Sequence, residues 1–336
     1  MGNPIEKVRI DDRDLSAFHE VAGLGDRARA LHLQQLATWE LAERGYASLA
    51  EVQLRNFSLA GSTIRVQFNP GRLKSSSAKV DAQSIRERAC FLCVENLPDE
   101  QRGVPFGDGY LLLVNPFPIF PEHFTIPSLN HKPQRIENAL TAFLDLARDL
   151  GPRYTAFYNG PRCGASAPDH LHFQAGTAGF MPMDGEFFRL RDAVGKPFGM
   201  RDGVKVTSLE EMLCRCIALE AEDRDALKAE CARLLAILAA MAGDGEEPMI
   251  NILVRYEEGW RVLVIPRARH RPSFYSAAGD GILLSPASVD LGGVCIVPRE
   301  EDFHRIEEEQ IAAMFDEVCL SRDDFRRLRE WYGDSD

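Results

Sequence analysis

The segment 170–175 reads H-L-H-F-Q-A, so two histidines and a glutamine alternate with apolar residues. In a β-strand, side chains two positions apart point to the same side. His170, His172 and Gln174 would then share one polar face, while the apolar residues of the segment face a core. A half-buried strand normally exposes no such cluster, so the polar face predicts a functional site. The alternative is a pair of hydrogen-bonded surface histidines.

A loop with two glycines precedes this segment. Residues 159–166 read N-G-P-R-C-G-A-S and combine the glycines with an amide, a cation and a hydroxyl. Glycine lets backbone N–H groups approach a phosphate without obstruction by a Cβ atom. An imidazole beside such a loop is suited to nucleophilic attack on phosphorus.

Cysteine and histidine also gather in this region. Cys90 and Cys93 form a C-x-x-C pair, and four of the eight histidines lie within residues 123–172. C-x-x-C is a spacing typical of metal ligands. A redox dithiol is the alternative, but it should open a helix in a thioredoxin-like βαβ unit, and the sequence predicts none there.

Several basic residues could meet an anionic ligand. The loop 70–77 carries Arg72 and Lys74 among glycine, proline and serine, although a solvated surface loop has the same composition. Further candidates are Arg162, Arg267, Arg269 and Arg271. A solvated surface position is the alternative for each of them.

Periodicity predicts the elements that must position these residues. Helices are expected over residues 28–49, 135–150 and 209–241. Strands are expected over residues 63–68, 110–115, 124–127, 154–158, 170–175, 249–255, 261–265 and 293–297, with a hairpin turn at 257–259. Strands with intervening helices indicate an α+β protein in which helices cover a sheet.

An internal echo suggests a duplication. Residues 126–133 and 265–272 share the pattern I-P-x-x-x-H-basic-P, and each follows a predicted strand. Only the first half contains H-x-H, so the second half is expected to be degenerate. We therefore divide the chain into an N-terminal extension (1–85), a catalytic half (86–180), a helical insertion with an acidic linker (181–245) and a degenerate second half with a C-terminal helix (246–336).

Composition limits the classes of function. The chain has 336 residues and a formal net charge of −12, which disfavours binding to nucleic acid or to an anionic membrane. No apolar run approaches the roughly 18 residues of a membrane span, and the N-terminus begins neither a signal peptide nor a myristoylation site. We expect a cytoplasmic protein with buried free cysteines.

The motifs resemble the histidine-triad superfamily, in its transferase branch with H-x-H-x-Q. That branch includes galactose-1-phosphate uridylyltransferases, diadenosine tetraphosphate phosphorylases and GDP-L-galactose phosphorylases. The similarity lies in N-G at 159–160, G-A-S at 164–166, H-L-H-F-Q-A at 170–175 and N-P-F-P-I-F-P-E-H at 115–123. The resemblance implies an antiparallel sheet with flanking helices, duplicated as two halves.

The resemblance also implies roles for individual residues. His172 would attack the α-phosphorus of a nucleotide and hold the nucleotidyl group, and the Gln174 amide would donate to a nonbridging oxygen. Residues expected to bind the leaving phosphate or the nucleotide are Ser166, Gly164, Ala165, Asn159, Asn115, Phe117, Arg72 and Lys74. Ala165 stands where uridylyltransferases often have cysteine, which argues against a galactose-1-phosphate substrate.

The same resemblance implies a structural zinc ion. Its ligands would be Cys90, Cys93, His131 and His170, a closed tetrahedral set, with His123 as the alternative fourth ligand. The expected substrates are a nucleoside diphosphate sugar or a dinucleoside polyphosphate, with phosphate or a sugar phosphate as acceptor. A noncatalytic nucleotide-binding protein and a nucleotide hydrolase are the alternatives. Exposed sheet edges make a homodimer reasonable.

Overall fold

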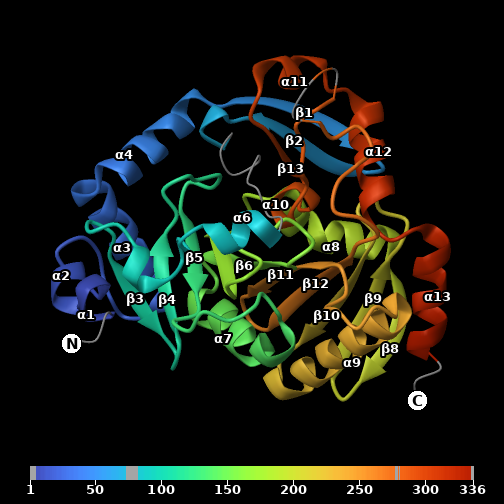
Figure 1. The fold of residues 1–336 in the computed structure, drawn as a ribbon. Coiled ribbons are helices and arrows are strands. Elements are labelled where there is room, and N and C mark those ends of the chain that lie inside the picture. Colours follow the sequence, from blue (N-terminus) through green and yellow to red (C-terminus); the bar gives the residue numbers. More distant parts are fainter. Residues whose placement is uncertain (1–4, 73–81, 277–278, 280, 334–336) are drawn as a thin grey trace.

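The architecture is a long antiparallel sheet with a smaller sheet beside it. A computed structural model describes residues 5–72, 82–276, 279 and 281–333. The ten strands of the large sheet run in the order β3-β4-β5-β7-β6-β11-β12-β10-β9-β8, and every neighbouring pair is antiparallel (Figure 1). Their bounds are β3 Gly103–Phe106, β4 Tyr110–Val114, β5 His123–Pro127, β6 Tyr154–Asn159, β7 His172–Thr177, β8 Lys196–Arg201, β9 Val204–Leu209, β10 Cys216–Ala221, β11 Ile250–Tyr256 and β12 Trp260–Pro266.

The large sheet consists of one five-stranded pattern used twice. Read from its two ends inward, the order is β3-β4-β5-β7-β6 on one side and β8-β9-β10-β12-β11 on the other. In each half, a long helix connects the third strand of that half, counted along the chain, to its fourth. This helix is α7 (Leu140–Leu150), between β5 and β6, in the first half and α9 (Arg224–Ala242), between β10 and β11, in the second. The halves meet where β6 pairs with β11. The predicted α+β fold and its repeat are therefore confirmed.

The repeat begins earlier than the sequence suggested. The helix expected over 209–241 is wrong for its first part, because β10 and the end of β9 occupy that stretch and α9 begins only at Arg224. The second half of the sheet thus starts within the predicted helical insertion (181–245). β9 and β10 are largely buried, so they lack the alternation that marks a half-exposed strand, and β8 carries Pro197 and Gly199 at the sheet edge. The domain limits themselves stay a prediction.

The I-P echo does not mark equivalent positions in the two halves. Ile126 and Pro127 end β5, the third strand of the first half, whereas Ile265 and Pro266 end β12, which corresponds to β7. The inference of a duplication was correct, but this short pattern was the wrong reason for it. The order of strands in the sheet carries the repeat instead.

One face of the sheet is covered by α7, α9, α3 (Leu24–Thr38) and α13 (Arg322–Gly333). Leu171, Phe173 and Ala175 all lie in the core on this face, as the alternation in 170–175 predicted. Phe173 stacks on Phe143 of α7, with the ring centres 4.8 Å apart. This packing fixes which way the polar residues of β7 must point.

The opposite face carries a second hydrophobic core and a three-stranded sheet. That sheet pairs β1 (Gln53–Leu59), β2 (Ser62–Phe68) and β13 (Val294–Val297), so it joins an N-terminal hairpin to a C-terminal strand. Figure 1 shows it above the large sheet, near the helices that share this side. These are α8 (Pro182–Val194), α10 (Ser288–Leu291), α11 (Glu300–Arg305) and α12 (Glu308–Val318).

The remaining elements refine the predicted ones. The helix expected over 28–49 is broken at Trp39, whose extended backbone separates α3 from α4 (Glu40–Ala47). The other helices are α1 (Ile5–Val8), α2 (Asp12–Leu15) and α6 (Ala82–Glu87), with 3-10 turns at Ser48–Glu51, Pro70–Arg72, Val94–Asn96 and Glu137–Ala139. Among the described helices, none has both the length and the apolar character needed to cross a membrane.

Removing the Phe143 ring should destabilise the fold. The side chain is 1% exposed, and its deletion leaves a cavity between α7 and β7. We expect Phe143→Ala to lower the free energy of unfolding by about 3–5 kcal/mol, measured by urea denaturation. Phe18→Ala is the matched control, because Phe18 is 37% exposed and should lose no more than about 1 kcal/mol. Equal losses would contradict this assignment of the core.

Candidate active site

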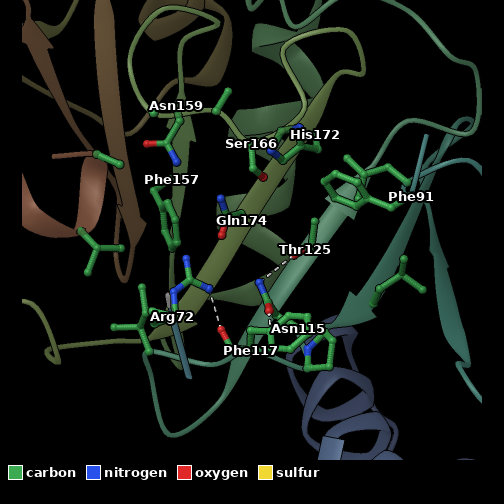
Figure 2. A pocket seen from close by; sticks show the side chains of 18 of the residues that line it. Arg72, Phe91, Asn115, Phe117, Thr125, Phe157, Asn159, Ser166, His172 and Gln174 are labelled. Atoms are coloured by element: carbon green, nitrogen blue, oxygen red, sulfur yellow. Dashed lines mark hydrogen bonds between the residues drawn. The ribbon is translucent and has the colours of Figure 1, made fainter. Parts of the chain in front are cut away.

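A cavity of about 510 Å³ opens on the face of the sheet opposite α7 and α9. Its floor is a row of side chains at paired positions on four adjacent strands: Leu113, Thr125, Gln174 and Phe157. Figure 2 shows His172 and Ser166 at one end of this floor, with Asn159 and Arg72 on one wall and Phe91 on the other. Residues from the second half, including His270, Arg271 and Asp290, complete the lining.

A backbone hydrogen bond fixes the protonation of His172. Its Nδ1 lies 2.8 Å from the carbonyl oxygen of His170. A carbonyl can only accept, so Nδ1 carries the proton and the lone pair of the neutral ring is on Nε2. Burial lowers the pKa of His172 to about 4, so the ring is neutral at pH 7. His172 is therefore a neutral imidazole with an unprotonated Nε2.

Gln134 holds the start of β7 in place and was not predicted. Its Oε1 accepts a hydrogen bond from His172 N–H, and its Nε2 donates to the carbonyl oxygens of His172 and Asn159. The side chain is 1% exposed, so these bonds are formed away from water. A single glutamine just before a predicted helix gives no signal of such a role in the sequence.

A second histidine sets the orientation of the Gln174 amide. His123 Nδ1 accepts from Ile119 N–H, so the proton is on Nε2, which donates to Gln174 Oε1 at 3.0 Å. Burial is the main reason that the pKa of His123 falls to about 3, which keeps this ring neutral as well. With its oxygen held by His123, Gln174 directs its NH2 group away from His123, on the face that lines the cavity.

Asn159 ties the first half to the second. Its Oδ1 accepts from Asn251 Nδ2 on β11 and from both the backbone N–H and the hydroxyl of Ser288 at the start of α10. Because Oδ1 accepts these three bonds, the side-chain nitrogen of Asn159 points toward the cavity (Figure 2). Asn159 was predicted from the N-G pair, whereas Asn251 and Ser288 were not.

The glycine loop is packed against the second half. Gly164 has a φ of +95°, and a Cβ atom there would lie 2.6 Å from Ala287 Cβ, so only glycine fits. Ser166 lines the cavity, and Arg88 donates to its carbonyl oxygen at 3.1 Å. The loop therefore brings Gly164, Ala165 and Ser166 to the cavity that contains His172, as the sequence predicted.

At the other end the cavity is apolar. Phe91 and Phe117 are 44% and 39% exposed, and both line it together with Trp39, at the break between α3 and α4, and Leu41, in the first turn of α4. Asn115 joins them: its Oδ1 accepts from Phe117 N–H, and its Nδ2 donates to Thr125 Oγ1 (Figure 2). Exposed aromatic rings in a cavity suit a planar apolar group such as a nucleobase.

Cys90, Cys93, His131 and His170 form a cluster that could hold a metal ion, with all four ligand atoms within 4.8 Å of one another. Sulfur to nitrogen distances are 3.2 Å for Cys90–His170 and Cys93–His131 and 3.6 Å for Cys93–His170. Tetrahedral zinc with typical bond lengths would require about 3.5 Å. His170 Nε2 donates to Ser128 O and His131 Nε2 lies 3.6 Å from Asp169, so Nδ1 of each ring faces the thiols.

Some predicted placements need correction. His170 does not share a strand face with His172, because β7 begins at His172 and His170 lies in the preceding turn, directed at the cysteines. His123 is not a metal ligand, since its two nitrogens bond to Ile119 and Gln174. Lys74 lies outside the described residues, while Arg72 lines the cavity and donates to Phe117 O.

Three of the predicted phosphate-binding arginines have structural partners instead. Arg162 bonds to Asp244 and to the carbonyl of Glu247, so it anchors the predicted acidic linker. Arg267 is 4% exposed and donates to Asn251 and to four backbone carbonyls, and the exposed Arg269 pairs with Glu317. Arg271 lines the cavity.

The protonation of the two buried histidines can be measured. At pH 7 we expect nitrogen NMR to show His172 protonated on Nδ1 and His123 on Nε2, with signals assigned by their loss in His172→Asn and His123→Asn. Both folded-state pKa values lie below the ordinary 6.5, so the free energy of unfolding should fall as the pH drops from about 6.5 toward 4. Protonation of His172 on Nε2 would contradict the assignment.

Comparison with known proteins covers both halves of the chain. Residues 31–177 match a family model described as a domain of unknown function (DUF4922). Residues 194–333 match a model described as a GDPGP1-like C-terminal domain. No curated protein sequence matches the chain.

Solved structures share the fold. Yeast Ap4A phosphorylase Apa2 in complex with AMP is 17% identical, with a TM-score of 0.56 over 84% of this chain and 98% of that one. The same enzyme in complex with Ap4A is 18% identical, with a TM-score of 0.55 over 84% of this chain and 97% of that one. In its fold, and in the family model that matches its second half, the chain resembles the phosphorylase and transferase branch of the histidine-triad superfamily.

Proposed function

We propose that this protein is a nucleotidyltransferase of the phosphorylase type. It cleaves a nucleoside diphosphate sugar or a dinucleoside polyphosphate at the α-phosphate and transfers the nucleotidyl group, through His172, to phosphate or a sugar phosphate. The observation that carries the proposal is the pairing, in one cavity, of an unprotonated His172 Nε2 with a Gln174 amide whose NH2 group is directed by His123.

In the first step His172 Nε2 attacks the α-phosphorus. A bond forms between nitrogen and phosphorus, the bond from phosphorus to the bridging oxygen breaks, and that oxygen leaves with the electron pair as part of a phosphate anion. The ring gains positive charge, which the His170 carbonyl at Nδ1 stabilises. The Gln174 NH2 group donates to a nonbridging oxygen as negative charge builds there. Ser166 and the N–H groups after Gly164 bind the departing phosphate.

Transfer to an anion fits this cavity better than hydrolysis. Water must lose a proton when it attacks, but Gln174 cannot act as a base, and the lone pair of His123 already accepts a hydrogen bond from Ile119 N–H. A phosphate oxygen is already anionic and needs no base. The nitrogen to phosphorus bond then breaks, and His172 returns to its neutral form with Nδ1 still protonated.

The cavity also fits the size and polarity of the substrates. A volume of about 510 Å³ is in the range of ligand pockets, and the apolar end around Phe91 and Phe117 suits a nucleobase. Asn115 lies beside Phe117, and Asn159 lies on the side of Ser166 and the glycine loop, where they can meet the nucleoside and the α-phosphate. The fold shared with a yeast phosphorylase crystallised with AMP and with Ap4A is consistent with a nucleotide ligand.

We propose zinc as the metal of the cysteine and histidine cluster. Two thiolates and two imidazoles complete a tetrahedral shell and suit Zn²⁺ in a structural role. Bound there, the ion would cross-link the loop of Cys90 and Cys93 to the residues that precede β7. His170 would be held by Nδ1 on the metal side and by Nε2 on Ser128, which fixes the carbonyl that orients His172.

A covalent adduct is the direct test of the reaction. The protein should be incubated, without phosphate, with a panel of nucleotide sugars and dinucleoside polyphosphates, and its intact mass measured at alkaline pH because phosphoramidates are acid-labile. We expect a mass increase equal to one nucleoside monophosphate, which also identifies the base, and no increase in His172→Asn.

The control is His304→Asn, since His304 is an exposed histidine on α11 and should label as the wild type does. Nucleotide binding without an adduct, in folded wild-type protein, would favour the noncatalytic alternative. Release of free nucleoside monophosphate in the absence of phosphate, at the rate of adduct formation, would favour a hydrolase.

The metal proposal predicts one zinc ion per chain. We expect Cys93→Ser to lose the ion in elemental analysis and to unfold at a lower urea concentration, because a structural metal contributes directly to folding free energy. Cys231→Ser is the matched control, since Cys231 is a buried thiol on α9 that belongs to no metal cluster of the described chain. Wild-type protein that stays metal-free when refolded with zinc would refute the assignment.

A further inference from the structure

Arginines collect around the cavity although the chain is acidic. The formal net charge is −12, yet among the described residues the charged side chains that line the cavity are three arginines and a single carboxylate: Arg72, Arg88, Arg271 and Asp290. This local excess of positive charge suits a ligand that carries more than one phosphate. The arginines differ in how far their donors are already used.

Arg72 and Arg88 have partners within the first half. Arg72 donates to the carbonyl of Phe117, and Arg88 donates to the carbonyl of Ser166 and to Asp169. Both hydrogen bonds to carbonyls hold segments that shape the cavity. These two arginines therefore help to build the walls of the nucleotide site.

Two contacts hold the guanidinium group of Arg271 in place: a hydrogen bond from Nε and the packing of the planar group on an aromatic ring. Nε donates to Ser285 Oγ at 2.9 Å, and the guanidinium lies 4.1 Å from the centre of the Tyr275 ring. Within the part of the chain that the structure describes, neither terminal nitrogen of Arg271 has a hydrogen bond or a carboxylate partner. The two terminal NH2 groups of a guanidinium, oriented in this way, match two oxygens of a phosphate.

The segment that follows Ser285, the hydrogen-bond partner of Arg271, lies against the glycine loop. Ala287, two residues after Ser285, is in contact with Gly164, and Ser288 bonds to Asn159. Arg271, Ser285 and Ser166 line the same cavity. The neighbouring His270 also lines it, but burial lowers its pKa to about 4, so Arg271 is the positive charge of this pair at neutral pH.

We propose that Arg271, positioned by Ser285 and Tyr275, binds the phosphate that accepts the nucleotidyl group from His172. This inference rests on the proposed function and assigns a task to the degenerate second half: it supplies the cation for the anionic acceptor. The acceptor oxygen attacks the phosphorus on His172, the nitrogen to phosphorus bond breaks, and a nucleoside diphosphate or its ester forms without any proton transfer. The phosphate that leaves in the first step occupies the same site, because the second step reverses the bond changes of the first: a phosphate oxygen leaves phosphorus in one and attacks it in the other.

Discharge of the adduct tests this assignment. Wild type, Arg271→Gln and Arg271→Lys are converted to the nucleotidyl form, desalted, and mixed with increasing concentrations of inorganic phosphate, and loss of the adduct mass is followed in time. We expect Arg271→Gln to need about 10- to 100-fold more phosphate for half-maximal discharge, as for loss of a charge-assisted hydrogen bond. Arg271→Lys should lie in between, because lysine keeps the charge but not the paired donors.

Arg269→Gln is the matched control. Arg269 lies two residues away, is exposed, pairs with Glu317 and does not line the cavity, so its phosphate dependence should equal that of the wild type. Hexose 1-phosphate replaces inorganic phosphate in a second arm, and the probe that discharges the adduct at the lower concentration identifies the acceptor. An unchanged phosphate dependence in Arg271→Gln would overturn the inference.

Calorimetric titration with inorganic phosphate separates this inference from the reaction itself. If wild type forms no adduct but binds phosphate and Arg271→Gln binds it at least about 10-fold more weakly, the anion site stands and the proposed transfer fails. If wild type forms the adduct while phosphate binding and discharge do not depend on Arg271, the transfer stands and the anion site fails. Loss of folding in Arg271→Gln is checked by its urea midpoint, and Arg271→Lys then provides the comparison.

Discussion

The hydrogen bond from His172 Nδ1 to the carbonyl of His170 is the constraint on which the site depends. It decides which ring nitrogen can act as a nucleophile, and it requires that the His170 backbone stay fixed. His170 is fixed because its side chain joins Ser128 on one side and the two cysteines on the other. The same residue therefore belongs to the cluster through its ring and orients His172 through its carbonyl, so a change at His170 would affect both places.

The second half of the sheet contributes through buried polar contacts as well as by packing. Asn251 donates to Asn159 and accepts from Arg267, whose other donors hold the carbonyls of residues 269 and 270. A chain of side chains thus runs from the glycine loop to the segment that carries Arg271. Because these groups are buried, each donor or acceptor would be costly to leave without its partner. The contacts therefore hold the two halves in a fixed arrangement around the cavity.

Much of the site could be predicted from sequence because its residues are close together in the chain. The alternation in 170–175, the glycine loop and the C-x-x-C pair are local patterns, and the structure brings them to one cavity and one cluster. Contacts between distant segments gave no such signal: His123 with Gln174, Gln134 with His172, and Asn251 with Asn159. The strands β9 and β10 were missed because they are largely buried on both faces. Such burial removes the alternation of apolar and polar residues that reveals a strand in a sequence.

The pairing of β6 with β11 has a consequence for how a ligand enters. These strands lie at the centre of the sheet and join its two halves by backbone hydrogen bonds. A hinge motion that separated the two halves of the sheet would break those bonds, so the cavity does not open by such a motion. A ligand enters instead past the segments that rim the cavity, outside the sheet, while the floor of Thr125, Gln174 and Phe157 stays in place. The floor of the cavity is then in place before a ligand arrives, and ligands are selected by their fit to a preformed surface.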